Sequence, residues 1–143
     1  MNDNDFSAAV SERRFGGIAR LYGADALNRF AAAHVCVVGV GGVGSWAIEA
    51  LARSGIGALT LIDLDNVAES NVNRQLHALT CDFGKAKVTA LHERILQINP
   101  ACRVTEIEDF VTEDNLPVLF RRPFDFVIDA IDQMRIQAAM AAY

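Results

Sequence analysis

The feature that most constrains this chain is a glycine-rich turn between a short apolar run and a helix-like segment. Residues 34–40 read HVCVVGV, and the run leads into the pattern Gly39-Val40-Gly41-Gly42-Val43-Gly44. A continuous apolar run of this length that stops at glycines is typical of a buried strand in a parallel sheet. Residues 42–54 then carry apolar side chains at helical spacing and end at Gly55, a common helix terminator. The order strand, glycine turn, helix predicts a phosphate-binding turn.

The rest of the chain continues the alternation of strands and helices. Strands are predicted at residues 58–64, 103–107 and 125–130, and helices at residues 84–99, 112–122 and 133–143. Residues 9–33 predict two helices broken near Gly23, whereas residues 65–83 are polar and show no period. Alternating elements of this kind imply crossover connections. We expect an α/β, Rossmann-like domain over residues 34–143, with a mostly parallel sheet and helices on both faces. A helical segment, residues 1–33, precedes it and packs on it.

Composition excludes several classes of protein. No apolar run approaches the roughly 18 residues that cross a bilayer, and the start MNDNDFS lacks the basic and apolar parts of a secretory signal. These features predict a cytoplasmic protein. The net charge of −5 argues against a broad nucleic-acid surface. The spacing of Cys36, Cys81 and Cys102 fits no zinc or redox motif and predicts free thiols.

An acidic residue ends the second predicted strand and supports a nucleotide site. Asp63 stands 19 residues after Gly44, where a carboxylate can accept hydrogen bonds from ribose hydroxyls. The carboxyl ends of parallel strands meet at one edge of a sheet, so residues after Val40, Leu64 and Ala130 should gather there. These features predict nucleotide binding, but they leave NAD, FAD, S-adenosylmethionine and ATP open.

The polar segment from Asp65 to Gln75 favours a triphosphate over a nicotinamide. Arg74 offers a planar fork of donors that suits phosphate, and the amides of Asn71 and Gln75 add neutral donors. The alternative is structural: Ser70 and its neighbours cap a short helix, and their charges are solvated. When the polar residues of this segment are considered together, phosphate binding is the better interpretation.

Two further groups of charged residues also indicate a bound phosphate. Lys85 and Lys87 open the predicted helix at residues 84–99, where a cation is unfavourable to the helix dipole unless a phosphate is bound there. Asp129 and Asp132 flank the end of the fourth predicted strand and offer the oxygen ligands that Mg²⁺ prefers. We therefore expect ATP and Mg²⁺ at this edge of the sheet.

These motifs together resemble a known family. The run GxGGxG, followed by DxDxVxxSNxxRQ, GxxK and DxxD, is similar to the signature of the ThiF/MoeB (E1-like) superfamily, and the likeness covers roughly residues 14–133. The resemblance implies a twofold dimer that adenylates a carboxylate with ATP and Mg²⁺. It implies nucleotide contacts for Gly39, Gly41, Gly42, Gly44, Asp63, Asp65, Ser70, Asn71, Arg74, Gln75 and Lys87.

The resemblance also implies roles for single residues. Gly42 would pack against the nucleotide and Asp63 would bind its ribose. Asn71, Arg74 and Lys87 would hold the phosphates, and Asp132 would hold Mg²⁺. Catalysis would then rest on Arg74, Lys87 and Asp132.

A bacterial subgroup of the family is the most similar. The phrases RRFGGIARLYGADAL and NRQLHAL resemble a subgroup whose substrate is the threonyl carboxylate of threonylcarbamoyladenosine at position 37 of tRNA. In that subgroup adenylation is followed by ring closure with net dehydration, and the implied partners are tRNA, a cysteine desulfurase and its sulfur acceptor. The alternative is adenylation of the C-terminal Gly-Gly of a ubiquitin-like sulfur carrier. An NAD-dependent oxidoreductase and a nucleotide-binding fragment without turnover also remain open.

The chain departs from the family pattern in two places. Many members carry R-[YF]-x-R-Q near the start, and its second arginine reaches the γ-phosphate in the partner subunit's site. Here the sequence is Arg14-Phe15-Gly16-Gly17, which leaves Arg14 or Arg20 as substitutes. Members also continue well past this length, so we expect a fragment or a shortened relative. Because the net charge is acidic, a basic surface for tRNA is expected downstream or on a dimer partner.

Overall fold

A four-stranded parallel sheet organises the chain. The computed structural model describes the backbone of residues 3–143 and the side chains of residues 13–143. The strands lie in the order β3-β2-β1-β4, and their bounds are β1 (His34–Val38), β2 (Ala58–Ile62), β3 (Arg103–Ile107) and β4 (Phe126–Asp129). In the register of the sheet, Val37 lies beside Leu61 on one side and Ile128 on the other. The strand order changes direction at β1, which opens a crevice beyond the carboxyl ends of β1 and β4.

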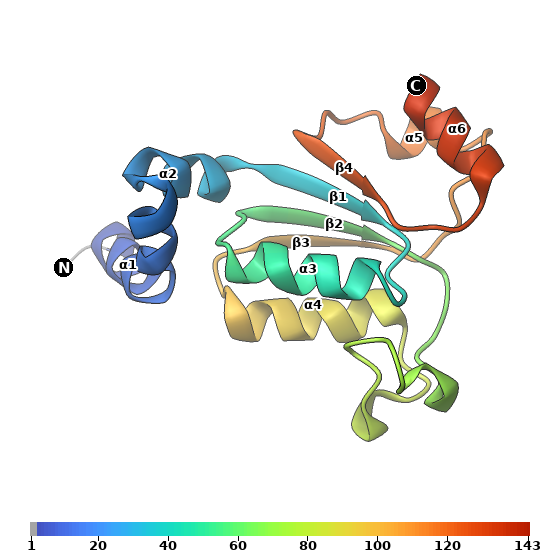
Figure 1. Ribbon diagram of the computed structural model, residues 1–143, viewed down its shortest axis with the longest axis horizontal. Helices are drawn as coiled ribbons and strands as arrows, with labels where there is room; N and C mark the ends of the chain where they lie inside the picture. Colours follow the sequence, from blue (N-terminus) through green and yellow to red (C-terminus); the bar gives the residue numbers. More distant parts are fainter. Residues whose placement is uncertain (1–2) are drawn as a thin grey trace.

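Helices cover both faces of the sheet, as the sequence predicts. Helices α3 (Gly44–Arg53) and α4 (Lys87–Ile98) lie side by side on one face, and α5 (Leu116–Leu119) and α6 (Met134–Ala142) lie on the other (Figure 1). The α3/α4 face holds the larger core, formed by Val35, Val37, Val40, Ile48, Ala52, Ile56, Leu59, Leu61, Val88, Leu91, Ile95 and Cys102. This Rossmann-like α/β arrangement confirms the predicted fold class.

The opposite face is more thinly covered. Its buried cluster consists of Cys36, Val38, Ile62, Val111 and Leu116. The helix expected over residues 112–122 forms only at Leu116–Leu119, with a proline in its first turn. Proline fits the first turn of a helix but cannot donate a backbone hydrogen bond further along, so the helix has to begin here and not earlier. All three cysteines are free, as predicted.

Two helices precede the sheet. Helix α1 (Asp3–Tyr22) and helix α2 (Ala24–Ala32) are separated by Gly23, whose φ of 90° is a conformation that glycine adopts readily. The buried side chain of Phe15 and a hydrogen bond from Gly57 N–H to the Phe30 carbonyl (3.0 Å) attach these helices to the rest of the chain. Residues 1–2 lie outside the described residues, and the division into units 1–33 and 34–143 stays a prediction. In the described part of the chain, no helix has the length and apolarity to cross a membrane.

The segment without a period, residues 65–83, is a well-anchored loop. It contains two single-turn 3-10 helices, Glu69–Asn71 and Thr80–Asp82. The Asn71 side-chain carbonyl accepts a hydrogen bond from Ala68 N–H at 2.9 Å, which closes the first of them. Val67 N–H donates to the Lys85 carbonyl at 2.8 Å and ties the two ends of the loop together. The loop runs below the carboxyl ends of the strands and returns the chain to α4 (Figure 1).

Candidate functional site

The glycine turn between β1 and α3 is as tight as its sequence suggests. Gly39 has a φ of 82°, and a Cβ placed on Gly44 would lie 1.8 Å from the Gly39 carbonyl oxygen. Gly39 N–H donates to the Ile62 carbonyl at 2.9 Å, so the turn is held against the end of β2. Helix α3 begins directly at Gly44, so its N-terminal end lies at the edge of the sheet where an anion can bind.

Asp63 joins the loops that follow the two central strands. Its Oδ2 accepts a hydrogen bond from Val40 N–H at 2.8 Å, and its Oδ1 accepts one from Asp65 N–H at 2.8 Å. A carboxylate has about four acceptor positions, so both oxygens can still accept from hydroxyl groups of a ligand. The residue predicted to bind ribose is therefore also a structural support of the glycine turn.

A cleft of about 380 Å³ opens at this edge of the sheet. It gathers nine of the predicted residues, namely Gly39, Gly41, Gly42, Asp63, Asp65, Arg74, Gln75, Lys87 and Asp132. The lining brings together residues that follow β1, β2 and β4, as the shared-edge argument predicts. Its ionisable side chains are four aspartates, one arginine and one lysine.

Both cations of the cleft are held in place. The Lys87 side chain is only 6% exposed, and its Nζ lies 2.9 Å from Asp65 Oδ2. One terminal nitrogen of Arg74, Nη1, donates to the Ser70 carbonyl at 3.0 Å and to Asn73 Oδ1 at 2.9 Å. The guanidinium is thereby oriented while its other N–H groups are left for a ligand.

Lys85 does not need the phosphate that its position in the sequence suggests. Its Nζ lies 2.9 Å from Asp82 Oδ1 and 2.7 Å from Glu93 Oε2. These hydrogen bonds raise the pKa of Lys85, so the cation is already compensated by carboxylates. Of the two lysines at the start of α4, Lys87 is the one at the cleft.

Three predicted residues do not line the cleft. Gly44 packs against the carbonyl of Gly39, Ser70 presents its carbonyl to Arg74, and Asn71 caps the short helix with its side chain. Their contact with a nucleotide stays a prediction. Asp129 accepts a hydrogen bond from Ile131 N–H at 3.1 Å and serves the local turn after β4.

The predicted metal ligand, Asp132, lies in the lining of the cleft. Among residues 13–143 there is no group of three or more histidine, cysteine, aspartate or glutamate side chains arranged to hold a metal ion. Mg²⁺ in nucleotide sites is commonly held by one or two carboxylates together with substrate phosphates. The donor set therefore fits a metal that arrives with a nucleotide, and Asp132 as its ligand stays a prediction.

Some residues of the cleft carry no sequence motif and were not predicted. Three follow β3, namely Asp109, Phe110 and Val111, and three follow β4, namely Ala130, Ile131 and Gln133. Phe110 is half exposed, whereas Val111 is buried. The signal was available, because β3 was predicted as a parallel strand and its carboxyl end must reach the same edge.

Two buried polar side chains lie at or near the cleft: Gln75 lines it, and His77 is close enough to Lys87 and Asp63 to be affected by their charges. Gln75 Oε1 and both ring nitrogens of His77 have no hydrogen-bond partner within the described residues. His77 is 1% exposed, and burial, helped by the Lys87 cation, lowers its pKa to about 4. The imidazole is therefore neutral near pH 7.

The start of α3 is bonded to the loop that carries Arg74. The indole N–H of Trp46 donates to the Arg74 carbonyl at 3.1 Å, and Leu76 N–H donates to Ser45 Oγ at 3.3 Å. The Trp46 side chain is nonetheless more than half exposed. The N-terminal end of α3 and the loop that carries Arg74 are thus joined by two hydrogen bonds.

The sequence is similar to a known protein family and to characterised members of it. The sequence model of the ThiF family matches residues 16–143. The tRNA threonylcarbamoyladenosine dehydratase of Escherichia coli is 60% identical over 131 residues, and that of Haemophilus influenzae is 52% identical over 132 residues. The matches cover 92% of this chain but 49% and 51% of those proteins. The chain therefore spans about half the length of these relatives.

A solved structure agrees with the sequence comparison. The crystal structure of the E. coli tRNA threonylcarbamoyladenosine dehydratase in complex with ATP superposes with a TM-score of 0.90 at 60% identity. The superposition covers 92% of this chain and 54% of that one. A second structure of the same protein contains AMP and gives the same TM-score of 0.90.

Proposed function

Since this chain belongs to the ThiF family, we propose that it forms the ATP-binding site of an enzyme that adenylates a carboxylate. The observation that carries the proposal is the cleft in which the glycine turn, Asp63, Arg74 and Lys87 converge at the carboxyl ends of the strands. A dinucleotide site needs the glycine turn and an acidic residue, but it does not need two fixed cations beside them. The similar E. coli enzyme has been crystallised with ATP and with AMP.

The residues of the cleft have distinct tasks in this proposal. The N–H groups at the start of α3 and the donors of Arg74 and Lys87 bind phosphate oxygens. Asp63 accepts hydrogen bonds from the ribose, and its bonds to Val40 and Asp65 keep the glycine turn in the shape that receives the phosphates. Phe110 and Val111 supply apolar surface to the lining of the cleft.

The charges of the cleft favour a divalent cation. Its lining carries four carboxylates and only two cations, so a polyanionic nucleotide would be repelled unless positive charge came with it. Mg²⁺ would be held by Asp132 and by phosphate oxygens, and it would neutralise charge on the phosphates. Arg74 and Lys87 would complete that neutralisation from the protein side.

The reaction depends more on the positioning of the two reacting groups than on acid–base catalysis. A carboxylate oxygen attacks the α-phosphorus of ATP, pyrophosphate leaves, and the acyl carbon gains AMP as a leaving group. No general base is needed, because a carboxylic acid is already ionised near neutral pH. Alignment of the two anions and electrostatic stabilisation by Arg74 and Lys87 account for the catalysis.

We propose that the carboxylate is the threonyl group of threonylcarbamoyladenosine in tRNA. The support is the 60% identity to an enzyme named for that reaction. After adenylation, attack from within the same side chain closes a ring and releases AMP, for a net loss of water. We propose further that the enzyme acts in the cytoplasm. Its proposed partners are a second copy of the protein, a cysteine desulfurase and a sulfur acceptor.

Mass spectrometry of nucleosides tests whether threonylcarbamoyladenosine in tRNA is the substrate. The full-length protein is incubated with ATP, Mg²⁺ and tRNA that carries threonylcarbamoyladenosine. Conversion to the dehydrated nucleoside is expected only when ATP is present. ATP–pyrophosphate exchange driven by a ubiquitin-like sulfur carrier, with the tRNA left unchanged, would keep the adenylation site and replace the substrate.

The Arg74→Ala variant tests the site. It removes charge-assisted contacts worth roughly 1.5–3 kcal/mol each, so ATP affinity measured by calorimetry should fall by roughly one to two orders of magnitude. Arg135→Ala is the matched control, because Arg135 is an exposed arginine on α6 that pairs with Glu113. Equal ATP affinity in the two variants would remove Arg74 from the site.

A further inference from the structure

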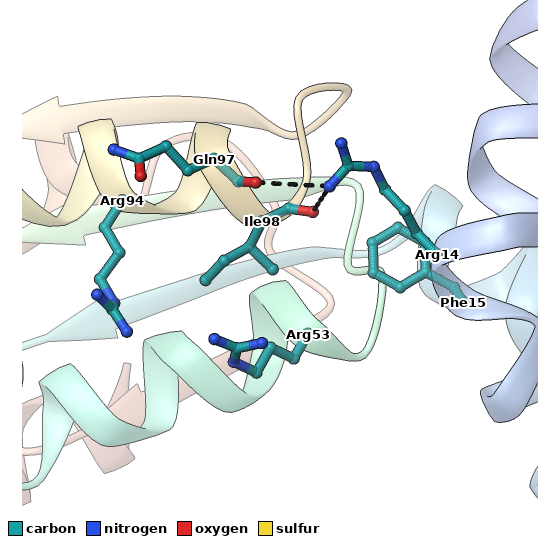
Figure 2. Close-up of a pocket in the computed structure, with 6 residues that line it drawn as sticks. All are labelled: Arg14, Phe15, Arg53, Arg94, Gln97 and Ile98. Atoms are coloured by element: carbon teal, nitrogen blue, oxygen red, sulfur yellow. Dashed lines mark hydrogen bonds between the residues drawn. The ribbon is translucent and has the colours of Figure 1, made fainter.

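A second cavity lies at the far end of α3 and α4 from the cleft. It measures about 420 Å³ and is lined by Arg14, Phe15, Arg53, Arg94, Gln97 and Ile98. Figure 2 shows that Arg53 and Arg94 come from the neighbouring helices α3 and α4, while Arg14 reaches across from α1. We call this cavity the three-arginine pocket.

The pocket concentrates positive charge on an acidic chain. Among the described side chains, residues 13–143, the one carboxylate paired with these arginines is Glu49: Arg94 Nε lies 2.6 Å from Glu49 Oε2, and Arg53 Nη2 lies 2.8 Å from Glu49 Oε1. Arg14 Nη1 donates to the carbonyls of Gln97 (3.4 Å) and Ile98 (2.9 Å), which carry no full charge. Two of the three guanidinium groups therefore share the charge of Glu49, and the third is paired with uncharged carbonyls.

Glu49 holds the arginines in place without covering them. Its own side chain is 11% exposed, whereas the side chains of Arg53 and Arg94 are 60% and 37% exposed. The hydrogen bonds from Arg94 lower the pKa of Glu49, so this carboxylate stays ionised throughout the neutral range. The buried ring of Phe15 packs against Gly55 beneath the pocket. The exposed guanidinium donors are thus fixed in direction, and a ligand need not order them.

Helix stabilisation accounts for only part of this arrangement. Cations at the C-terminal ends of helices are favourable, and Arg14 and Arg53 sit at the ends of α4 and α3. That effect falls off within the last turn, and Arg94 lies before the last turn of α4. It does not explain why a third arginine, Arg94, is held at the same cavity by a buried carboxylate that it shares with Arg53.

The pocket and the cleft are joined by the same two helices. Helix α3 starts at the glycine turn and spans 10 residues, and α4 starts at Lys87 and spans 12 residues. At 1.5 Å per residue these helices are about 15 and 18 Å long. A polymer whose reactive group enters the cleft can therefore run along the α3/α4 layer and present a second anionic group to the pocket.

We propose that the three-arginine pocket binds phosphodiester groups of the RNA substrate's backbone. The inference rests on the proposed function, because a tRNA substrate is what supplies a polyanion tethered to the adenylated carboxylate. Arginine forks bind phosphate oxygens in pairs, and contacts to the backbone fix the position of a nucleic acid without reading its sequence. The pocket gives this acidic chain a local basic site, which its net charge alone did not predict.

Salt-dependent binding of tRNA tests the proposal. Fluorescently labelled tRNA carrying threonylcarbamoyladenosine is titrated with the full-length protein across a range of salt concentrations. Removing one arginine that binds a phosphate should reduce the slope of log Kd against log salt by about 0.7–0.9. We expect Arg53→Gln and Arg14→Gln each to reduce the slope in this way and to weaken binding roughly three- to tenfold at physiological salt. ATP affinity should be unchanged in Arg53→Gln.

A matched control and a conservative variant sharpen the test. Arg135→Gln removes one exposed arginine that donates its Nε to a glutamate, as Arg94 does, but it lies on α6 far from the pocket. Arg135→Gln should keep the wild-type slope, and Arg53→Lys, which retains the charge, should keep most of it. Thermal unfolding of each variant establishes that the fold is intact.

The outcomes separate this proposal from the proposed function. If the unaltered protein neither binds nor dehydrates the tRNA, the proposed function is wrong. If it does both, and Arg53→Gln and Arg14→Gln keep the slope of Arg135→Gln, the pocket is not an RNA site. A loss of self-association in light scattering with tRNA binding intact would also overturn the proposal and assign the pocket to contact between copies.

Discussion

The central strands β1 and β2 and the outer strand β4 all consist mainly of apolar residues, but their surroundings differ. In β1 and β2, Val37, Leu59 and Leu61 are fully buried, whereas in β4 Phe126 is 69% exposed and Val127 is 42% exposed. β1 has hydrogen-bonded neighbours on both sides, whereas within residues 3–143 β4 pairs only with β1. Apolar character therefore predicts that a strand forms, and the number of its neighbours decides how far it is buried.

The loops that follow these strands differ in the same way. The loops after β1 and β2 are locked together by Asp63 and by the close approach of Gly39 and Gly44. The loops after β3 and β4 carry exposed groups, among them Phe110 and Asp132, and no comparable bond joins the two within the described residues. We infer that the inner pair provides a fixed frame for the phosphates, and that the outer pair supplies contacts that can adjust to the ligand.

The largest expected effect compares one valine from each kind of strand. Val37→Ala in β1 should lower the free energy of unfolding by about 2–4 kcal/mol, because it removes buried methyl groups and leaves a cavity. Val127→Ala in β4 should cost less than about 1 kcal/mol, because that side chain is partly in water. Urea denaturation measures both. Equal losses would mean that β4 is covered as fully as β1.

The second prediction concerns pH and the inner loops. The pKa of His77 is about 6.5 unfolded and about 4 folded, so its stabilising contribution is complete above pH 6.5 and is lost as the pH falls toward 4. The total is about 3 kcal/mol. His77→Leu should remove most of the fall in stability between pH 7 and pH 4. A smaller fall should remain, because burial also lowers the pKa of His34.

His92 provides the comparison on the outer side. It lies on α4, is partly exposed and pairs with Glu106 of β3. His92→Leu should leave the acid-dependent loss assigned to His77 in place. Denaturation at several pH values distinguishes the two variants, and an unchanged profile in His77→Leu would show that the buried imidazole does not control acid stability.

The third prediction compares two glycines. Gly44→Ala would place a Cβ 1.8 Å from the Gly39 carbonyl oxygen, so α3 has to shift, at a cost of about 1–3 kcal/mol and with loss of ATP affinity. Gly16→Ala in α1 meets no atom within 4 Å and should stabilise the helix by about 0.5–1 kcal/mol. Thermal unfolding should give opposite signs. A harmless Gly44→Ala would mean that the turn is not a rigid frame.

The smallest expected effect compares two aspartates of the cleft. Asp63→Asn loses an acceptor for Val40 N–H or Asp65 N–H and should cost about 1 kcal/mol of stability, together with ATP affinity. Asp132→Asn should change stability by less than about 0.5 kcal/mol and should weaken Mg²⁺-dependent turnover more than metal-free nucleotide binding. If Asp132→Asn reduced both equally, Asp132 would contact the nucleotide and not its metal.

The sequence predicted the parts of the molecule that are built from neighbouring residues. The strand, the glycine turn and helix α3 lie within one stretch, Gly39–Gly44 and its flanks, and their pattern is local. Asp63 was predictable because it ends the next strand at the same edge. The wall formed by Asp109, Phe110 and Val111 was missed, because its sequence has no motif and only the position of β3 identifies it.

Features formed by residues from several distant elements could not be predicted from the sequence. The three-arginine pocket brings residues from α1, α3 and α4 to one point, and the pairing of Glu49 with Arg94 spans 45 positions. The burial of His77 depends on how the loop 65–83 folds, and that loop shows no period. The same holds for Lys85, whose charge has no evident partner in the sequence and is compensated by Asp82 and Glu93 in the fold.

The bond between Trp46 and the arginine loop has a spectroscopic consequence. Trp46 is the single tryptophan of the chain, and its indole N–H is bonded to the carbonyl of Arg74 at the wall of the cleft. Indole emission depends on hydrogen bonding and on exposure to water, both of which change if the Arg74 loop moves when a nucleotide enters. The protein therefore carries its own fluorescent reporter, and titration with ATP can be followed through one residue without any label.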